Sequence, residues 1–365
     1  MKHISVLIKP ASSACNLRCE YCFYADVSEK RACTSFGKMN IEIMESMLDH
    51  VFMDLEAYDH VTFNFQGGEP TLAGLDYFKA FTSYVAHKQD RQVVHYGIQT
   101  NGTLLDDQWC RLFKEHKFLV GLSMDGGKDS HDQYRKDARK QGTYTRVMAA
   151  KKRLDAHANE YNVLCVLTNP LARHPRQVFN FLLEHQIRYI QFIPCLNGLD
   201  SRDRSVYALT PERFASFYKG LYPLWEQECR KGNYLHVSFF DHHLQLFANG
   251  TVGTCGMIGQ CQLQYVIEAD GSVYPCDFFV LDEWCIGNIT EHRLSELARS
   301  QQAGCFIHDK PPLSKYCTAC TYKEMCNGGC KRMKEACYVN DKESYCGYQD
   351  FLDQYLARLL RLVGA

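Results

Sequence analysis

The chain has 365 residues, of which 46% are apolar, and a formal net charge of −1. This length exceeds the usual size of one hydrophobic core, so we expect two domains, or one large α/β domain with an appendage. The near-zero charge and scattered basic residues exclude an electrostatic footprint for nucleic acid. No stretch approaches the ~20 apolar residues that span a bilayer. We therefore expect neither nucleic acid nor membrane as a partner, and a small or peptide-like substrate instead.

Nineteen cysteines are far more than an ordinary globular chain carries. Small disulfide scaffolds are much shorter than this chain, and the sequence after Met1 lacks the pattern of a signal peptide. We therefore expect a reducing, cytoplasmic location, where clustered cysteines more often bind metal than form disulfides.

The first half of the chain alternates short β-rich runs with amphipathic helical patterns. The predicted strands are Ser5–Ile8, His60–Phe65, Val93–Gln99, Phe118–Ser123, Asn162–Thr168 and Tyr189–Ile193. The predicted helices are Ile41–Phe52, Leu75–His87, Asp106–His116, Thr143–Ala158 and Arg176–His185, with Asp106 as an N-cap. Six such β/α repeats predict a parallel sheet with right-handed crossovers.

Polar or glycine-rich segments follow the predicted strands directly, which favours a partial (β/α)6 barrel of the TIM type over an open sheet. Loops that follow the strands of such a barrel converge on one face, where the chemistry is placed. The segments are Cys15–Cys22, Gln66–Pro70, Thr100–Gly102, Asp125–Gly127, Thr168–Pro170 and Asn197–Gly198.

The β/α rhythm stops after a helix that we expect to begin with Thr210 as its cap and to end near Gly232. Beyond this helix the cysteines become dense, so we place a domain boundary near residue 235, with residues 1–235 as the barrel and 236–365 as a cysteine-rich domain. In the second domain, Asp270-Gly271 predicts a hairpin with a type I′ turn. The segment Tyr348–Val363 has apolar residues at helical spacing and predicts a terminal helix.

Three cysteines, Cys15, Cys19 and Cys22, lie within eight residues directly after the first strand. A structural zinc site needs four ligands, whereas three thiolates on a four-iron cluster leave one iron open to a cofactor. This spacing, followed by Phe23-Tyr24, resembles the signature of the radical S-adenosylmethionine (SAM) superfamily. The resemblance implies a cluster that cleaves SAM to a 5′-deoxyadenosyl radical. Buried thiols or a zinc knuckle with a remote fourth ligand are the alternatives.

The segment Gln66-Gly67-Gly68-Glu69-Pro70 resembles the Gly-Gly-Glu segment of that superfamily, which holds the methionyl amino group. Paired glycines allow close backbone approach, and Glu69 provides an acceptor for an ammonium group. A plain tight turn is the alternative. The resemblance also implies nucleoside contacts, which fall on Tyr24, Ser123 and Leu196.

The cysteines of the second half resemble the SPASM domain found at the C-terminus of radical enzymes that modify peptides. The resemblance implies two auxiliary [4Fe-4S] clusters beside the SAM cluster, three in all. One set of ligands is Cys255, Cys261, Cys276 and Cys330, and the other is Cys317, Cys320, Cys326 and Cys346. Two zinc sites are the alternative, since Cys-x2-Cys is common in zinc ribbons. Cys337 could be mistaken for a ligand, and we predict that it is not one.

Three further runs resemble the anaerobic sulfatase-maturating enzymes, over nearly the whole chain. The runs are Ile8–Ser13, Phe118–Gly126 and Tyr274–Asp282. Such enzymes oxidise a cysteine or serine of a sulfatase to Cα-formylglycine, so the resemblance implies a sulfatase polypeptide as substrate and an electron donor such as flavodoxin or ferredoxin. It departs at Gly127, where the family usually has proline.

Removal of a hydrogen atom from Cβ leaves a radical that must lose one electron and one proton, so the reaction needs a base. The resemblance assigns this role to Asp277, next to Cys276, and a substrate contact to Gln66. Asp277 could instead only accept hydrogen bonds near the cluster. The rival enzyme is another SPASM-type peptide maturase that forms a thioether, an epimer or a cross-link, and the non-enzymatic rival is a zinc-stabilised binding module.

Overall fold

The computed structural model describes residues 1–201 and 203–364, which form two compact units. The first unit contains residues 1–123, 135–161 and 262–309, and the second contains residues 124–134, 162–201, 203–261 and 310–364. Because the chain passes between the units several times, they interleave along the sequence. The predicted boundary near residue 235 divides the chain into two continuous segments, whereas each compact unit consists of several segments. The predicted boundary therefore stays a prediction.

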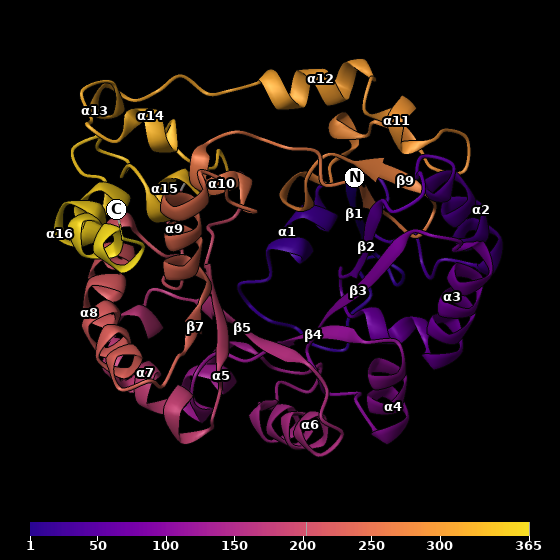
Figure 1. Ribbon diagram of the computed structural model, residues 1–365, viewed down its shortest axis with the longest axis horizontal. Helices are drawn as coiled ribbons and strands as arrows, with labels where there is room; N and C mark the ends of the chain where they lie inside the picture. Colours follow the sequence, from indigo (N-terminus) through magenta and orange to yellow (C-terminus); the bar gives the residue numbers. More distant parts are fainter. Residues whose placement is uncertain (202, 365) are drawn as a thin grey trace. The chain divides into compact units, whose positions relative to one another are not determined.

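The first unit is built on a parallel sheet that a hairpin extends at one edge (Figure 1). The strand order is β10-β9-β8-β1-β2-β3-β4, with β1 to β4 and the β1–β8 pair parallel and the β8–β9 and β9–β10 pairs antiparallel. The strands are β1 His3–Ile8, β2 His60–Phe65, β3 Val93–Thr100, β4 Phe118–Ser123, β8 Val266–Ile267, β9 Ser272–Tyr274 and β10 Gly287–Asn288.

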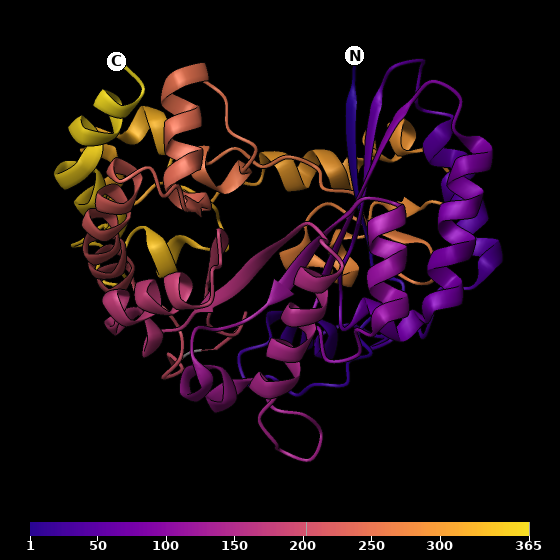
Figure 2. The same ribbon diagram turned by 60° about the horizontal axis from the view of Figure 1, so that its bottom comes forward.

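Helices cover one face of this sheet because alternate strand residues on that face are apolar. Val61, Phe63 and Phe65 of β2 are fully buried, and Phe65 packs on Phe78 and Phe81 at ring centroid distances of 4.7 and 4.9 Å. Figure 2 shows the early helices, coloured indigo to purple, along this side of the strands. The helices of this unit are α1 Phe23–Glu29, α2 Ile41–Phe52, α3 Leu75–Lys88, α4 Asp107–Glu115, α6 Tyr144–Ala156, α11 Leu294–Leu297 and α12 Gln301–His308.

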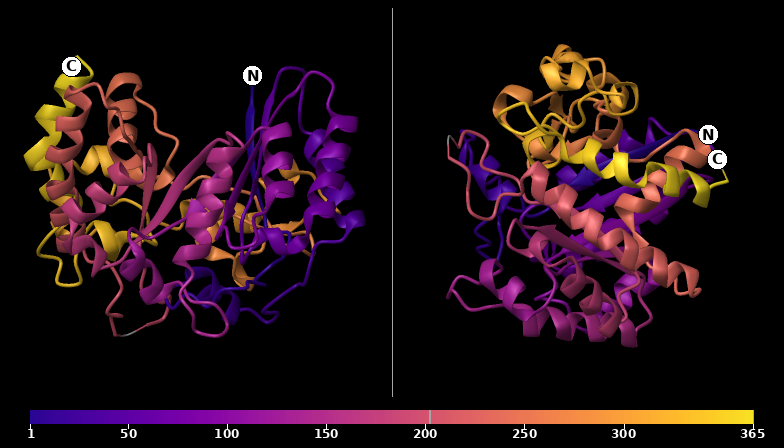
Figure 3. Two further views of the ribbon diagram at one scale, coloured as in Figure 1. Left: turned by 90° about the horizontal axis from the view of Figure 1, so that it is seen from below. Right: turned by 90° about the vertical axis from the view of Figure 1, so that its left-hand side faces the viewer.

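The second unit combines three parallel strands in the order β5-β6-β7 with a helical layer. In that layer α8 packs on α9 and the terminal helix α16, through Tyr218, Tyr222, Phe240, Phe351 and Tyr355. Figure 3 shows the yellow terminal helix alongside the salmon-coloured α8. The strands are β5 Tyr161–Leu167, β6 Tyr189–Pro194 and β7 His236–Val237. The helices are α5 Lys128–Tyr134, α7 Pro175–Glu184, α8 Pro211–Arg230, α9 Ser238–Asn249, α10 Cys255–Ile258, α13 Lys315–Thr318, α14 Lys323–Cys326, α15 Lys334–Cys337 and α16 Gly347–Leu362.

The predicted β/α elements are present with bounds shifted by two residues at most. Asp106 caps α4 by accepting from the backbone N–H groups of Gln108 and Trp109, and Thr210 caps α8 by accepting from that of Arg213. Among the residues that the structure describes, no helix is long and apolar enough to cross a membrane.

The hairpin at Asp270-Gly271 forms, but its predicted turn type is wrong. A type I′ turn needs positive φ at both central residues, whereas Gly271 has φ +87° and Asp270 stays outside the left-handed region. The backbone N–H of Gly271 donates to the carbonyl of Glu268 at 3.0 Å, and that of Glu268 donates to Ser272 at 2.9 Å. The last paired residues of the hairpin are therefore Glu268 and Ser272, and the loop between them has three residues, 269–271. Gly271, the last of these, has the left-handed conformation.

Candidate functional site

The cluster loop, Cys15–Cys22, follows β1 and ends where α1 begins, because Cys22 is the residue that precedes the first turn of α1. All three cysteines are half-buried. Burial raises the pKa of Cys15 to about 11, and the nearby Cys22 thiol adds to the rise. The side chains of Cys15 and Cys22 therefore lie close enough to interact, and metal binding would displace a proton from Cys15.

Two glycines bring the end of β2 against the segment that leads into this loop. The N–H of Gly68 donates to the carbonyl of Ser12 at 2.9 Å, and that of Glu69 donates to Ala14 at 2.8 Å. A Cβ atom at Gly68 would lie 2.1 Å from the carbonyl oxygen of Ala14. No residue except glycine fits there, so the paired glycines determine how the chain enters the cluster loop.

Glu69 is held in place by neighbouring donors and is almost fully buried. Its Oε1 accepts from Thr71 and from the Thr100 hydroxyl at 2.8 Å, and its Oε2 accepts from the Asn101 N–H at 2.8 Å. Burial raises the pKa of Glu69. A carboxylate has about four acceptor positions, so Oε2 keeps room for one more donor. That free position suits the ammonium group that the sequence predicted as its partner.

Asp277 lies at the centre of a second group of polar side chains in the first unit. Its Oδ1 is 2.5 Å from the Lys9 Nζ, its Oδ2 accepts from the Gln66 Nε2 at 2.7 Å, and its N–H donates to Gln264 at 2.9 Å. The Asp277 side chain keeps 11% of its surface exposed, whereas that of Lys9 is fully buried. Each carboxylate oxygen carries one hydrogen bond here, so both retain a lone pair for a further proton donor.

Tyr24 lies beneath Lys9 and is anchored by a buried ion pair. The Lys9 Nζ is 3.6 Å from the centroid of the Tyr24 ring, and the Tyr24 hydroxyl donates to Glu268. Glu268 also accepts from the Arg31 guanidinium at 2.6 Å, and both of these side chains are fully buried. Burial and the Glu268 charge raise the pKa of Tyr24 well above its ordinary value. Tyr24 therefore supports the Lys9–Asp277 pair with its ring, while its hydroxyl is engaged by Glu268.

Lys9, Arg31 and Glu268 were not among the residues predicted from the sequence. A usable signal was present for two of them, because Lys9 directly follows the apolar run of β1 and Glu268 directly follows that of β8. A charged residue at the end of a buried strand is seldom left unpaired. The pairing itself joins residues that are far apart in the sequence.

The other predicted nucleoside contacts lie at strand ends. Ser123 is the last residue of β4 in the first unit and is half-buried. Leu196 follows β6 in the second unit and is buried. Their contact with a nucleoside stays a prediction.

One predicted auxiliary set lies wholly within the second unit. Burial raises the pKa of Cys346 to about 12, and Cys326 and Cys317 add to the rise. Burial also raises the pKa of Cys326, with contributions from Cys320 and Cys317. The four thiols thus share one neighbourhood, with Cys346 at the N-terminus of α16.

Three cysteines of the other predicted set, Cys255, Cys261 and Cys330, also belong to the second unit, while Cys276 belongs to the first. A Cβ atom at Gly256 would lie 3.0 Å from that of Cys330, and Cys261 contributes to a raised pKa of Cys330. Cys337 is buried beside Cys330 and Cys346. Its exclusion as a ligand therefore stays a prediction.

The donor chemistry of these groups fits iron–sulfur clusters, because they consist of thiols alone and the first has three rather than four. Within the described residues, no three His, Cys, Asp or Glu side chains converge closely enough to hold a single metal ion. The residues that could hold SAM are Glu69 and the two glycines before it, next to the cluster loop.

Two family models match this chain and show the class of protein to which it belongs. Residues 10–174 match the family model of the radical SAM superfamily, and residues 255–321 match that of the SPASM iron–sulfur cluster-binding domain. The protein is therefore a radical SAM enzyme with a SPASM domain, whose cofactors are SAM and [4Fe-4S] clusters, and the predicted α/β fold with a TIM-like partial barrel is confirmed.

Relatives over the whole length narrow this class. The chain is 40% identical to the cysteine-type anaerobic sulfatase-maturating enzyme of Clostridium novyi, with 98% of this chain and 97% of that one covered. It is 31% identical to the serine-type enzyme of Klebsiella aerogenes, covering 97% and 85%. A solved structure described as native anSMEcpe with bound AdoMet and Cp18Cys peptide is 37% identical, with a TM-score of 0.90 and 99% of each chain covered. The chain belongs to the anaerobic sulfatase-maturating enzymes, as its sequence predicted.

Proposed function

We propose that this enzyme oxidises a cysteine of a sulfatase polypeptide to Cα-formylglycine, with Asp277 as the base. The observation that carries the proposal is the position of the Asp277 carboxylate, which Lys9 and Gln66 hold from two sides while both of its oxygens keep a free lone pair. The higher identity to the cysteine-type relatives, 40% against 31%, supports cysteine as the target residue. The full-length relatives named above favour this reaction over the rival peptide maturases.

Different residues are proposed to hold the cluster, the methionyl group and the nucleoside of SAM. We assign the SAM cluster to Cys15, Cys19 and Cys22, and the methionyl ammonium group to Glu69 with Gly67 and Gly68 giving it room. When bound, the cluster and SAM supply a 5′-deoxyadenosyl radical that takes a hydrogen atom from the substrate Cβ. Tyr24, Ser123 and Leu196 are proposed to line the nucleoside site.

Asp277 then accepts the thiol proton at one of its oxygens. Loss of that proton and of one electron from the Cβ radical gives a thioaldehyde, and water converts the thioaldehyde to the aldehyde with release of hydrogen sulfide. Gln66 and Lys9 orient the carboxylate, and Gln66 is placed to contact the peptide as well.

The two cysteine sets given above would hold the auxiliary clusters, which would supply an acceptor for the electron that the substrate radical loses. The ligands of one set are Cys255, Cys261, Cys276 and Cys330, and those of the other are Cys317, Cys320, Cys326 and Cys346. Flavodoxin or ferredoxin is the proposed donor to the SAM cluster, and the cytoplasm is the proposed location because it keeps exposed thiols reduced.

The decisive experiment compares sulfatase-like peptides that carry Cys or Ser, incubated anaerobically with the dithionite-reduced enzyme and SAM. We expect mass spectrometry to show the aldehyde with the Cys peptide and much less of it with the Ser peptide. Equal yields would contradict the assignment of cysteine, and absence of aldehyde from both, while 5′-deoxyadenosine still forms, would favour a rival maturase.

The role of Asp277 is tested by Asp277→Asn in the same assay. Loss of a general base costs about 10²–10⁴ in rate, so we expect aldehyde formation to fall by that factor while 5′-deoxyadenosine formation continues. Iron content serves as the control for folding and cluster assembly. Unchanged aldehyde formation in a fully loaded variant would remove Asp277 from the mechanism.

A further inference from the structure

A basic loop, residues 135–143, lies directly against the cluster loop. Leu17 and Asp137 form an isolated antiparallel bridge, and the N–H of Arg18 donates to the carbonyl of Lys136 at 2.7 Å. Arg18 stands between the cluster ligands Cys15 and Cys19, and its guanidinium donates to the carbonyls of Cys15 and Leu17. The basic loop is therefore joined by backbone hydrogen bonds to the chain that surrounds the cluster.

The basic loop has a well-defined conformation although its tip is exposed. The Asp137 Oδ1 accepts from the backbone N–H groups of Arg139 and Gln141 at 2.9 and 3.0 Å, and the N–H of Asp137 donates to the Gln141 carbonyl at 3.0 Å. Lys140 has a left-handed φ of +60° within this turn. A second bridge joins Lys136 and Gly142 at the base. The backbone of the loop is therefore held in one conformation, so binding of a partner requires little ordering of the backbone.

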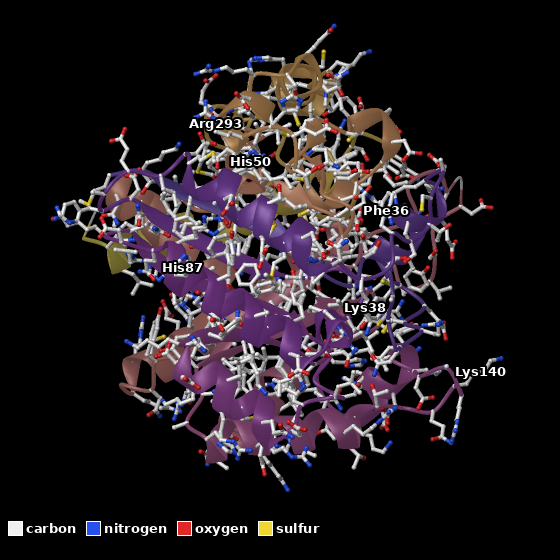
Figure 4. The ribbon with its side chains drawn as sticks, turned by 90° about the vertical axis from the view of Figure 1, so that its right-hand side faces the viewer. Phe36, Lys38, His50, His87, Lys140 and Arg293 are labelled. Atoms are coloured by element: carbon white, nitrogen blue, oxygen red, sulfur yellow. The ribbon has the colours of Figure 1, made fainter. Side chains whose placement is uncertain are left out.

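The charge of this surface is positive, whereas the whole chain has a net charge of −1. Two carboxylates lie among its cations, and each is already paired: Glu20 with Lys136 at 3.3 Å and Asp137 with Arg146 at 2.8 Å. Arg139 and Lys140 are exposed, and in the part of the chain that the structure describes neither is paired with a carboxylate. Figure 4 shows Lys140 on a loop that projects outward at the edge of the view.

We propose that the basic loop, together with Arg18, docks an acidic one-electron carrier of the flavodoxin or ferredoxin class. The inference rests on the proposed function, since radical SAM chemistry requires that one electron enter the cluster at Cys15, Cys19 and Cys22 from outside. The carrier is oxidised by one electron and the cluster is reduced by one. Complementary charge speeds such encounters and orients them, and redox partners typically meet over small surfaces. The basic loop provides the positive charge for such an encounter, and its hydrogen bonds to the cluster loop place it next to the cluster that receives the electron.

The test pairs the double variant Arg139→Glu/Lys140→Glu with a matched control, Lys79→Glu/Arg111→Glu, which reverses two exposed cations on α3 and α4. Binding of oxidised flavodoxin to each reconstituted enzyme is measured by calorimetry, and oxidation of flavodoxin hydroquinone by stopped flow. At low salt we expect the loop variant to raise Kd and slow the oxidation about tenfold or more, with the control near wild type. Wild-type Kd should rise steeply as salt shortens the screening length to below ~10 Å, and that of the loop variant should not.

Dithionite-driven aldehyde formation separates this inference from the proposed function, because dithionite needs no docking surface. We expect it to be unchanged in the loop variant. Unchanged flavodoxin binding, an equal loss in the control variant, or a loss of sulfatase-peptide binding in its place would overturn the proposal. If aldehyde never forms but flavodoxin binding still depends on the basic loop and on salt, the proposed function fails and the docking surface stands.

Discussion

Lys9 and Asp277 show how a residue's environment decides its role in this protein. A fully buried ammonium is costly unless it is paired, and Lys9 is satisfied by Asp277 and by the face of the Tyr24 ring. The same pairing orients the carboxylate whose free lone pairs suit it to act as a base. The Arg31–Glu268 pair beneath Tyr24 repeats this arrangement with a second set of buried charges. Both pairs contact Tyr24, since Lys9 lies over the face of its ring and Glu268 accepts from its hydroxyl.

Gly68 offers a prediction at the same scale, because a side chain there would meet the backbone that enters the cluster loop. We expect Gly68→Ala to displace residues 12–14 and to reduce iron by about four of roughly twelve atoms per chain, with loss of SAM cleavage. Anaerobic iron and sulfide analysis measures this.

Gly304→Ala is the matched control for Gly68→Ala, since a Cβ added at Gly304 would meet nothing within 4 Å beyond its chain neighbours and the backbone of its own helix. It should keep the full iron content. Full loading of Gly68→Ala would show that the close approach of β2 to the cluster loop is dispensable.

At the scale of elements, the two units use different means of stabilisation. In the first, the β1–β4 sheet and its helices bury a continuous aromatic layer around Phe65 and Phe118. In the second, α13, α14 and α15 have four residues each, too short to be stable alone. Cys317 of α13 and Cys326 of α14 belong to a predicted cluster set, so we expect cluster binding and folding to be coupled in this segment.

His243 in α9 gives this helical layer a pH dependence. It is fully buried, with Nδ1 2.6 Å from the Phe239 carbonyl and Nε2 2.9 Å from the Tyr348 hydroxyl. Burial lowers the pKa of His243 from 6.5 to about 4. Because the folded-state pKa is the lower one, the neutral ring stabilises the fold above the unfolded-state value, and this stabilisation is lost as the pH falls through that window.

Between neutral pH and about pH 5.5, we expect His243 to cost ~1 kcal/mol of unfolding free energy. The His243→Asn variant keeps a donor toward Phe239 but cannot titrate. Over the same pH interval, we expect its thermal midpoint to fall by roughly 2–4 °C less than that of the wild-type protein. Any acid loss of iron affects both proteins alike. Parallel pH dependences would mean that His243 is charged or solvated in the folded state.

At the scale of the whole molecule, the cysteines of the SAM-cluster loop and those of the last auxiliary set lie in different units. Cys15, Cys19 and Cys22 belong to the first unit, and Cys317, Cys320, Cys326 and Cys346 belong to the second. Each unit builds its own ligand neighbourhood from local backbone, so loss of one cluster need not remove the other.

The variant Cys15→Ala/Cys19→Ala/Cys22→Ala therefore should retain about eight of roughly twelve irons and lose SAM cleavage completely. Iron analysis and electron paramagnetic resonance of the reduced protein measure this. Cys305→Ser, which changes an exposed cysteine outside all three sets, should keep the full complement. Zinc in place of iron would support the zinc alternatives instead.

The sequence by itself determined the β/α order, the caps at Asp106 and Thr210, the spacing of Cys15, Cys19 and Cys22, and the family, because periodicity, capping and ligand spacing are local properties of the chain. Only the tertiary structure decided the Lys9–Asp277 and Arg31–Glu268 pairs, whose partners lie more than 230 residues apart. It also decided the hairpin's turn type, which depends on where strand pairing closes, and the bonding of the basic loop to the cluster loop. Pairings between distant segments form only when the packed fold brings them together, and no local pattern encodes them.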